Sequence, residues 1–162
     1  MTSLNITMTE PVFRMHHRII YGDTDAGGVV YNANYLRYFE MGRTELMRAR
    51  FIPYSTIEER GLLIPVTETY LRFKAPARYD ELITIDTSLA EIKKFSCRFN
   101  HRILRILRIL GEDKEQLLVK GFTVHACIDR QGKLTPFPED LCQAMTAPGE
   151  NSGRTEHPLD IS

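Results

Sequence analysis

The segment 21–40, YGDTDAGGVVYNANYLRYFE, holds the residues of this chain that are best suited to chemistry. Two carboxylates, Asp23 and Asp25, stand in a turn that ends in Gly27 and Gly28, because glycine accepts positive φ and aspartate bonds its own backbone in tight turns. A helix is predicted directly after this turn. The first amides of a helix have no partner within it and carry partial positive charge, so they can polarise a carbonyl group. An aspartate folded back toward them would act as a general base or a nucleophile.

Hydrophobic periodicity predicts the two elements that hold this turn. Residues 13–20 alternate in the manner of a strand, which delivers the chain into the turn. Residues 33–50 carry apolar side chains at three- and four-residue steps, which predicts a helix with one face against a core. Asn32 or Asn34 is expected to cap its start. The stripe expected to face the core consists of Tyr35, Phe39, Gly42, Leu46 and Ala49.

The rest of the chain is predicted to form strands. The candidate strands are 63–74, 82–89, 95–103 and 118–128, with turns at 111–113 and 129–132. One early helix followed by strands predicts an α+β fold, with the helix laid across an antiparallel sheet. The tandem repeat RILRILRIL at 102–110 has a period of three, which suits neither a plain strand nor a 3.6-residue helix. The repeat is compatible with an extended hairpin edge, from which aggregation or an extra intersubunit contact could follow, and the sequence alone does not decide its role.

Composition indicates one small domain. A chain of 162 residues with 43% hydrophobic content can bury one core, and its 21 basic and 21 acidic residues give no electrostatic case for binding nucleic acid or an anionic membrane. Cys97, Cys127 and Cys142 have no CxxC spacing and are odd in number, so reduced thiols are expected. Neither a leader-like segment nor a membrane-spanning apolar run is present, so we expect a soluble, cytoplasmic protein.

The segment YGDTDAGGVVYNANY at 21–35, with Glu40 and Arg43 after it, resembles the signature of the 4-hydroxybenzoyl-CoA thioesterase family. It is most similar to the acyl-CoA thioesterase branch associated with the Tol–Pal system. The resemblance continues in IPVTETYLRFKAPARYDELITIDT at 64–87 and in VHACIDRQGKLTPFPEDL at 124–141. It is weakest in the arginine repeat.

The resemblance implies a hotdog fold and hydrolysis of an acyl-CoA without cofactor or metal. It assigns Asp25 as the catalytic aspartate, and the backbone N–H at about Asn32 as the donor that holds the thioester carbonyl. Tyr31 and Ala33 flank that donor and are expected to contact substrate. Asp25 either attacks the carbonyl to give an acyl-aspartyl anhydride or activates a water. An acyl-carrier-protein thioesterase and a non-catalytic acyl-CoA-binding module are the alternatives.

The resemblance also implies a site shared between subunits. Lys93, Lys94 and Ser96 correspond to family residues that meet coenzyme A phosphates, often from the partner chain. A homodimer is therefore expected, and a tetramer more so. The hotdog domain should span residues 12–146, between an N-terminal extension at 1–11 and a flexible tail at 147–162.

Other polar residues are given structural roles. Asp23 is expected to order the turn, and Glu40 and Arg43 to form an ion pair on the helix. The histidines are expected to be structural or exposed, not metal ligands. A hydratase acting on enoyl-CoA would need an aspartate–histidine pair, and no histidine lies within the motif.

Overall fold

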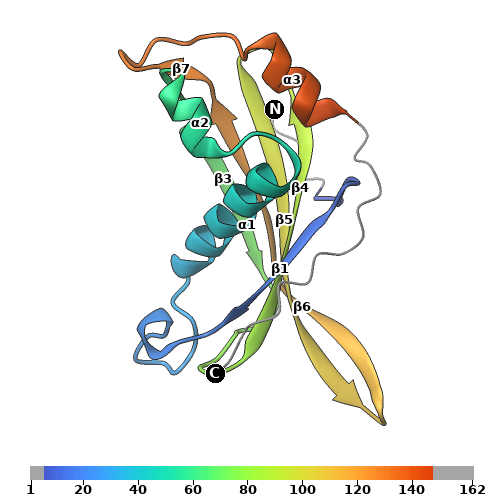
Figure 1. Cartoon of the computed structure of the whole chain (residues 1–162). Coiled ribbons are helices and arrows are strands. Elements are labelled where there is room, and N and C mark those ends of the chain that lie inside the picture. Colours follow the sequence, from blue (N-terminus) through green and yellow to red (C-terminus); the bar gives the residue numbers. More distant parts are fainter. Residues whose placement is uncertain (1–5, 148–162) are drawn as a thin grey trace, which may run out of the picture.

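The computed structural model describes residues 6–147, in which one curved antiparallel sheet surrounds a long helix (Figure 1). The main sheet has the order β1-β4-β5-β6-β3, and β2 pairs with β7 in a second, two-stranded sheet. The strands are β1 (Phe13–Arg18), β2 (Leu62–Leu63), β3 (Val66–Phe73), β4 (Leu82–Ile92), β5 (Ser96–Ile109), β6 (Glu112–Ala126) and β7 (Ile128–Asp129). The helices are the 3-10 turn η1 (Tyr21–Asp23), α1 (Asn34–Arg50), α2 (Tyr54–Glu59) and α3 (Glu139–Thr146). The predicted α+β class is confirmed.

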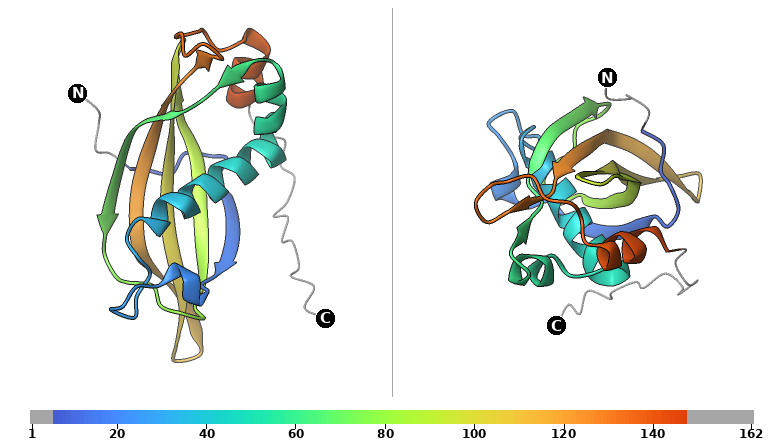
Figure 2. Two further views of the ribbon diagram at one scale, coloured as in Figure 1. Left: turned by 90° about the vertical axis from the view of Figure 1, so that its left-hand side faces the viewer. Right: turned by 90° about the horizontal axis from the view of Figure 1, so that it is seen from above.

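Helix α1 lies against the concave face of the sheet, which curves around it (Figure 2). Ile83, Ile85 and Thr87 alternate along β4 and are completely buried. Gly42 permits the close approach, because a Cβ at this position would lie 2.2 Å from Thr87 Oγ1. A helix wrapped by an antiparallel sheet is the hotdog arrangement expected from the resemblance.

The core has two halves along α1. One half lies under the 19–33 loop and includes Ile19, Val30, Tyr35 and Phe39. The other half lies under the end of α1 and is closed by α2 and α3, through residues such as Ile57 and Leu141. The motif is therefore held by the first half, and the two short helices cover the second.

Several details of the helices differ from the prediction. Helices α2 and α3 were not predicted, because each is short and follows a proline, Pro53 or Pro138. Ala33, and neither asparagine, stands at the N-cap of α1, and no side chain caps it. Ala49 is exposed, since the last turn of α1 lies outside the part of the helix that the sheet covers.

The arginine repeat lies in a long β5–β6 hairpin that extends beyond the rest of the sheet (Figures 1 and 2). Its two-residue turn, Leu110–Gly111, has φ of 52° and 83°, as the twist of a tight hairpin requires. A bulge between Ile103 and Leu104 shifts the register. The repeat thus forms part of an extended hairpin, a structure that the sequence left undecided, and the hairpin tip exposes apolar side chains.

No helix within residues 6–147 is long and apolar enough to cross a membrane. Residues 7–9, upstream of β1, lie against the convex face of the sheet, where the Thr9 amide donates to Ser88 Oγ at 3.1 Å and Asn100 Nδ2 donates to the Thr7 carbonyl at 3.0 Å. The proposed tail lies outside the described residues, apart from position 147.

Candidate active site

Asp25 lies in a tight, exposed loop between η1 and α1. Its Oδ1 accepts a hydrogen bond from the Gly27 amide at 2.8 Å, and its carbonyl accepts one from Gly28 at 3.0 Å. Gly28 has φ of 78°, and a Cβ on Gly27 would lie 3.0 Å from Asp25 Oδ1. The positive φ favours glycine at position 28, and a side chain at position 27 would crowd the Asp25 carboxylate. One carboxylate oxygen is held by the loop, and the exposed side chain remains open to a substrate.

Asp23 is the buried carboxylate of the motif, with 5% of its surface exposed. Its Oδ2 accepts hydrogen bonds from His17 Nε2 at 3.1 Å and from the Ile20 amide at 3.2 Å. Burial alone would raise the pKa of Asp23, but these hydrogen bonds outweigh burial and hold the pKa below its usual value. Asp23 is therefore ionised at neutral pH and orders the loop, as predicted.

Two backbone amides at the start of α1 have no acceptor within the described residues. The Tyr31 amide donates to the Asp23 carbonyl at 2.9 Å, and the Asn34 amide donates to Tyr31 at 2.9 Å. Between them, the N–H groups of Asn32 and Ala33 make no hydrogen bond with any of residues 6–147. Unpaired amides at a helix start are suited to hold a carbonyl oxygen that gains negative charge.

The segment that connects β3 to β4 fixes the loop from the other side. The Val30 amide donates to the Ala77 carbonyl at 2.9 Å, and the Ala77 amide donates to Tyr35 Oη at 3.2 Å. Ala77 itself is completely buried. The 64–87 segment, which carries part of the resemblance, thus contacts the motif directly.

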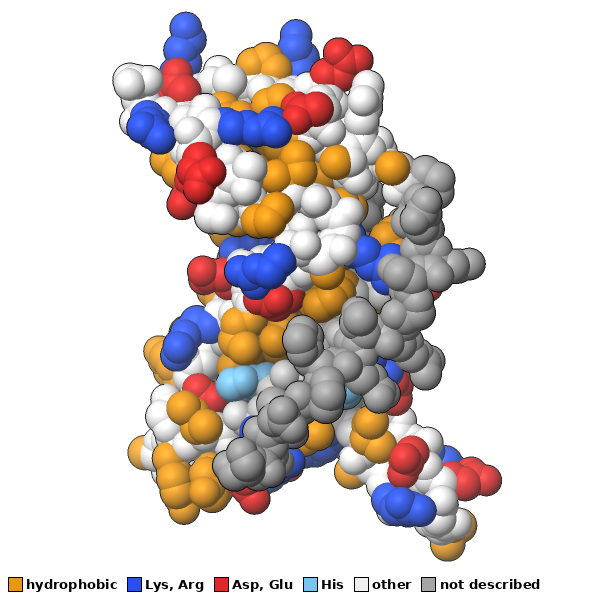
Figure 3. Space-filling view, in the orientation of Figure 1, with side chains coloured by type: hydrophobic (Ala, Val, Ile, Leu, Met, Phe, Trp, Pro, Cys, Tyr) orange, Lys and Arg blue, Asp and Glu red, His pale blue; other side chains and the backbone are white. Residues whose placement is uncertain are grey.

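This end of the molecule exposes many large apolar side chains (Figure 3). They come from the motif loop, from the end of β3, from the segment between β3 and β4, from the start of β4, and from the projecting hairpin: Ile20, Tyr21, Tyr31, Phe73, Tyr79, Leu82, Ile106, Leu107, Ile109 and Leu110. The rings of Tyr21 and Tyr79 stack at 3.7 Å between centroids. Such a concentration is typical of a binding or association surface.

Lys93, Lys94 and Ser96 lie at the opposite end of the sheet from Asp25. They form the β4–β5 turn, in which the Lys93 amide donates to the Ser96 carbonyl at 2.7 Å. Leu82 at the start of β4 pairs with Arg18, just before the motif, whereas Ile92 ends the strand at the lysine turn. Eleven strand residues separate these ends, a span of roughly 35 Å. One subunit does not bring the predicted phosphate contacts to Asp25.

Both lysines are exposed, and each has a local partner. Lys93 Nζ lies 3.4 Å from Glu91, and Lys94 Nζ lies 5.2 Å from the Phe95 ring centroid. Surface contacts of this kind contribute little and are easily exchanged for a phosphate. The lysines are thus accessible to an anionic ligand.

The buried histidines form part of a polar chain across the core. His101 contacts Thr87 Oγ1 at 3.1 Å and Thr123 Oγ1 at 3.3 Å, and His125 contacts the same Thr123 hydroxyl at 2.8 Å. Burial, together with the nearby Arg43, lowers the pKa of His125 to about 4 and that of His101 well below its usual value. Both are neutral structural histidines, as expected.

The other candidate groups do not form a second reactive centre. Among residues 6–147, no three His, Cys, Asp or Glu side chains are grouped as metal ligands. Burial raises the pKa of the Cys97 thiol to about 12, so it is not a thiolate at neutral pH. The ion pair predicted between Glu40 and Arg43 is not formed in the described part of the chain; both residues line a cavity of about 250 Å³ beside His125.

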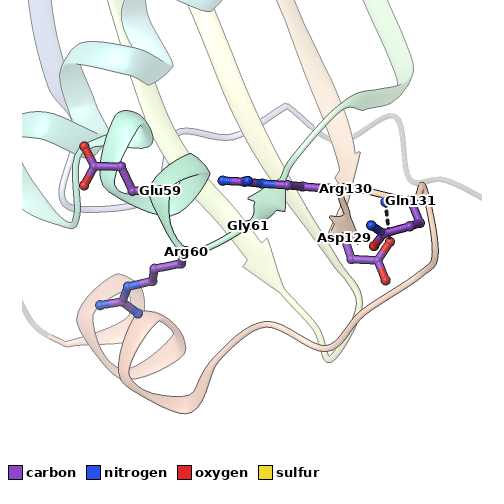
Figure 4. A pocket seen from close by; sticks show the side chains of 6 residues that line it. All are labelled: Glu59, Arg60, Gly61, Asp129, Arg130 and Gln131. Carbon is purple, nitrogen blue, oxygen red and sulfur yellow. Dashed lines mark hydrogen bonds between the residues drawn. The ribbon is translucent and has the colours of Figure 1, made fainter.

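A larger open pocket, of about 360 Å³, lies far from the motif (Figure 4). It is formed where α2 meets the turn after β7, and Glu59, Arg60, Gly61, Asp129, Arg130 and Gln131 line it. Asp129 Oδ1 is occupied by the Gln131 amide at 2.9 Å and the Lys133 amide at 2.8 Å. The pocket contains none of the predicted site residues.

Sequence reasoning missed His17 and Asn34 as parts of the site. His17 lies on β1, six residues before Asp23, and Asn34 Nδ2 donates to the Asp23 carbonyl at 2.8 Å. The aspartate–histidine pair that the motif itself lacks is thus formed with the strand. The inward-facing position of His17 in the alternation of β1 was the signal that could have indicated it.

Comparison with known proteins shows the family to which the chain is similar. A model of the thioesterase-like superfamily matches residues 19–145. The acyl-CoA thioesterase YbgC of Haemophilus influenzae is 34% identical over 141 residues, which cover 85% of this chain and 97% of that protein. A putative esterase of Aquifex aeolicus is 28% identical, with coverage of 82% and 97%.

Solved structures show the same architecture. A hypothetical protein from Thermus thermophilus superposes with a TM-score of 0.72 at 33% identity, over 82% of this chain and 96% of that one. A mutant 4-hydroxybenzoyl-CoA thioesterase in complex with 4-hydroxybenzoyl-CoA superposes with a TM-score of 0.74 at 23% identity, over 83% and 99%. The second likeness concerns the fold alone.

Proposed function

The chain belongs to the thioesterase-like superfamily and is a thioester hydrolase, and we propose that it hydrolyses acyl-CoA at the loop that carries Asp25. The observation that carries this proposal is the pair of unoccupied amides, Asn32 and Ala33, in the loop that also exposes the Asp25 carboxylate. These amides bind the thioester carbonyl oxygen and stabilise the charge that it gains. Asp25 supplies the negative charge that a nucleophile or general base needs.

Two routes are open to Asp25. In the first, its carboxylate attacks the carbonyl carbon, the coenzyme A thiolate leaves, and water then hydrolyses the acyl-aspartyl anhydride. In the second, Asp25 takes a proton from a water that attacks directly. Both routes end in a free acid and coenzyme A. Tyr31 and Ala33, on either side of Asn32, are proposed substrate contacts.

We propose that the complete site is shared between two copies of the chain. Strand β3 forms an open edge of the sheet, and Val66 and Phe73 at its two ends are exposed. If two copies pair antiparallel along this edge, the Asp25 end of one sheet lies beside the Lys93 end of the other. The partner's Lys93, Lys94 and Ser96 then meet the phosphates of a coenzyme A whose thioester is at Asp25. A dimer of dimers remains the expected assembly, and the cytoplasm the expected location.

The proposal is tested by measuring thiol release from a panel of acyl-CoA substrates with aliphatic and aromatic acyl groups. We expect turnover with at least one of them. Thiol release from the same acyl groups carried on acyl carrier protein tests the alternative that the chain is an acyl-carrier-protein thioesterase. Tight acyl-CoA binding without thiol release from any member would instead identify a binding module.

A further inference from the structure

The unoccupied amides of Asn32 and Ala33 lie between two residues, Tyr31 and Asn34, that both donate a hydrogen bond to the same oxygen atom. The carbonyl oxygen of Asp23 accepts hydrogen bonds from the Tyr31 amide at 2.9 Å and from Asn34 Nδ2 at 2.8 Å. Asn32 and Ala33 are the two residues between these anchors. The direction of their N–H groups therefore depends on where the Asp23 carbonyl is held.

The position of Asp23 is fixed in turn by hydrogen bonds to its side chain, one of which comes from β1. Its Oδ2 accepts from His17 Nε2 of β1 at 3.1 Å and from the amide of Ile20, the residue before η1, at 3.2 Å. The His17 ring also lies against Tyr38 of α1, with 5.0 Å between centroids. His17 is thereby packed between the strand, the loop and the helix, and its ring cannot move far without moving Asp23.

We propose that His17 and Asp23 are a positioning pair that aims the Asn32 and Ala33 amides at the thioester carbonyl. Neither residue touches the substrate in this account. His17 holds the Asp23 carboxylate, and the Asp23 carbonyl holds both sides of the oxyanion-binding turn. The inference rests on the proposed function, because the amides matter only if a carbonyl oxygen binds there.

The pair predicts a loss of rate with little loss of binding. Amides that are turned away from the developing oxyanion stabilise the transition state less, whereas contacts with the coenzyme A portion are unchanged. For His17→Leu we expect kcat to fall by roughly 10- to 100-fold, with KM changed by less than about twofold. For His17→Gln, whose side-chain amide can still donate to Asp23, we expect most of kcat to return.

His16 provides a matched control. It precedes His17 on β1, is exposed, and contacts Thr84 on the opposite face of the sheet. His16→Leu should leave both kinetic constants unchanged. Asn34→Ala removes the side-chain hydrogen bond to the Asp23 carbonyl and leaves His17 intact, so it should reproduce the kcat loss. It replaces His17→Leu as the test if that variant does not fold.

A second measurement does not depend on turnover. In a ¹H–¹⁵N spectrum of the full chain, the Asn32 and Ala33 amide resonances should shift in His17→Leu and stay in place in His16→Leu. Wild-type kcat in folded His17→Leu and Asn34→Ala, with unmoved amide resonances, would overturn the positioning pair. Failure of the wild-type chain to hydrolyse any acyl-CoA would instead remove the proposed function, and the spectra would still show whether His17 positions the two amides.

Discussion

Asp25 and Lys93 lie at opposite ends of strand β4, although both are assigned to one substrate. The motif loop follows Arg18, which pairs with Leu82 at the start of the strand, and Lys93 follows Ile92 at its end. Within one subunit, the proposed reacting group and the proposed phosphate contacts therefore lie far apart. This separation is the physical reason why we propose a site shared across the open β3 edge.

Subunit mixing tests that shared site. If Asp25→Asn subunits are refolded together with Lys93→Ala/Lys94→Ala subunits, each mixed dimer has one site with both intact contributions. Random pairing should then restore about a quarter of the wild-type number of high-affinity, active sites. Sites contained within one chain would give no such recovery, and sedimentation showing an active monomer would also contradict the model.

The lysines should affect binding more than chemistry. For Lys93→Ala/Lys94→Ala we expect KM for acyl-CoA to rise roughly 5- to 30-fold, at about 0.5 to 1 kcal/mol for each exposed contact with a phosphate. The kcat should change little, because the phosphates are remote from the reacting carbon. An acyl thioester that lacks the nucleotide is the control substrate, and equal losses on both substrates would indicate a folding role.

Gly42 should tolerate no side chain. A Cβ at this position would lie 2.2 Å from Thr87 Oγ1 and 3.0 Å from Ile85 Cγ2. Gly42→Ala should therefore lower the free energy of unfolding by about 1 to 3 kcal/mol, despite alanine's higher helix propensity. Gly22→Ala, whose Cβ would meet only Ile20 Cδ1 at 3.8 Å, is the matched control. Equal denaturation midpoints for wild type and Gly42→Ala would refute the close helix–sheet contact.

His125 should make the fold sensitive to mild acid. Its pKa is lowered to about 4 by burial, so the unfolded chain binds a proton between about pH 6.5 and 4 that the folded chain does not. The stabilisation that comes from keeping His125 neutral is fully present above pH 6.5. As the pH falls toward 4, the free energy of unfolding decreases by up to about 3 kcal/mol. Denaturant unfolding at pH 7.5 and 5 should show a smaller difference for His125→Asn than for wild type. An unchanged difference would show that His125 is not the group responsible, and His16→Gln is the control.

Residues whose role follows from local pattern were predicted well. Helix α1, the strand that leads into the motif, and the turn at Gly28 follow from periodicity and glycine chemistry, which act over a few residues. Sequence could not place His17 against Asp23, because that contact depends on how a strand meets the loop after it. Ala49 was assigned to the core because periodicity does not show where the sheet stops covering a helix.

Asp25 is tested most directly by its change to asparagine, which keeps the acceptor for Gly27 and removes the charge. Asp129→Asn is the matched control, since Asp129 accepts amide hydrogen bonds in a similar turn at the far end of the molecule. We expect acyl-CoA hydrolysis by Asp25→Asn to fall by at least about 100-fold, with the fold intact and Asp129→Asn fully active. Near-normal hydrolysis by a folded Asp25→Asn protein would contradict the assignment of the active site.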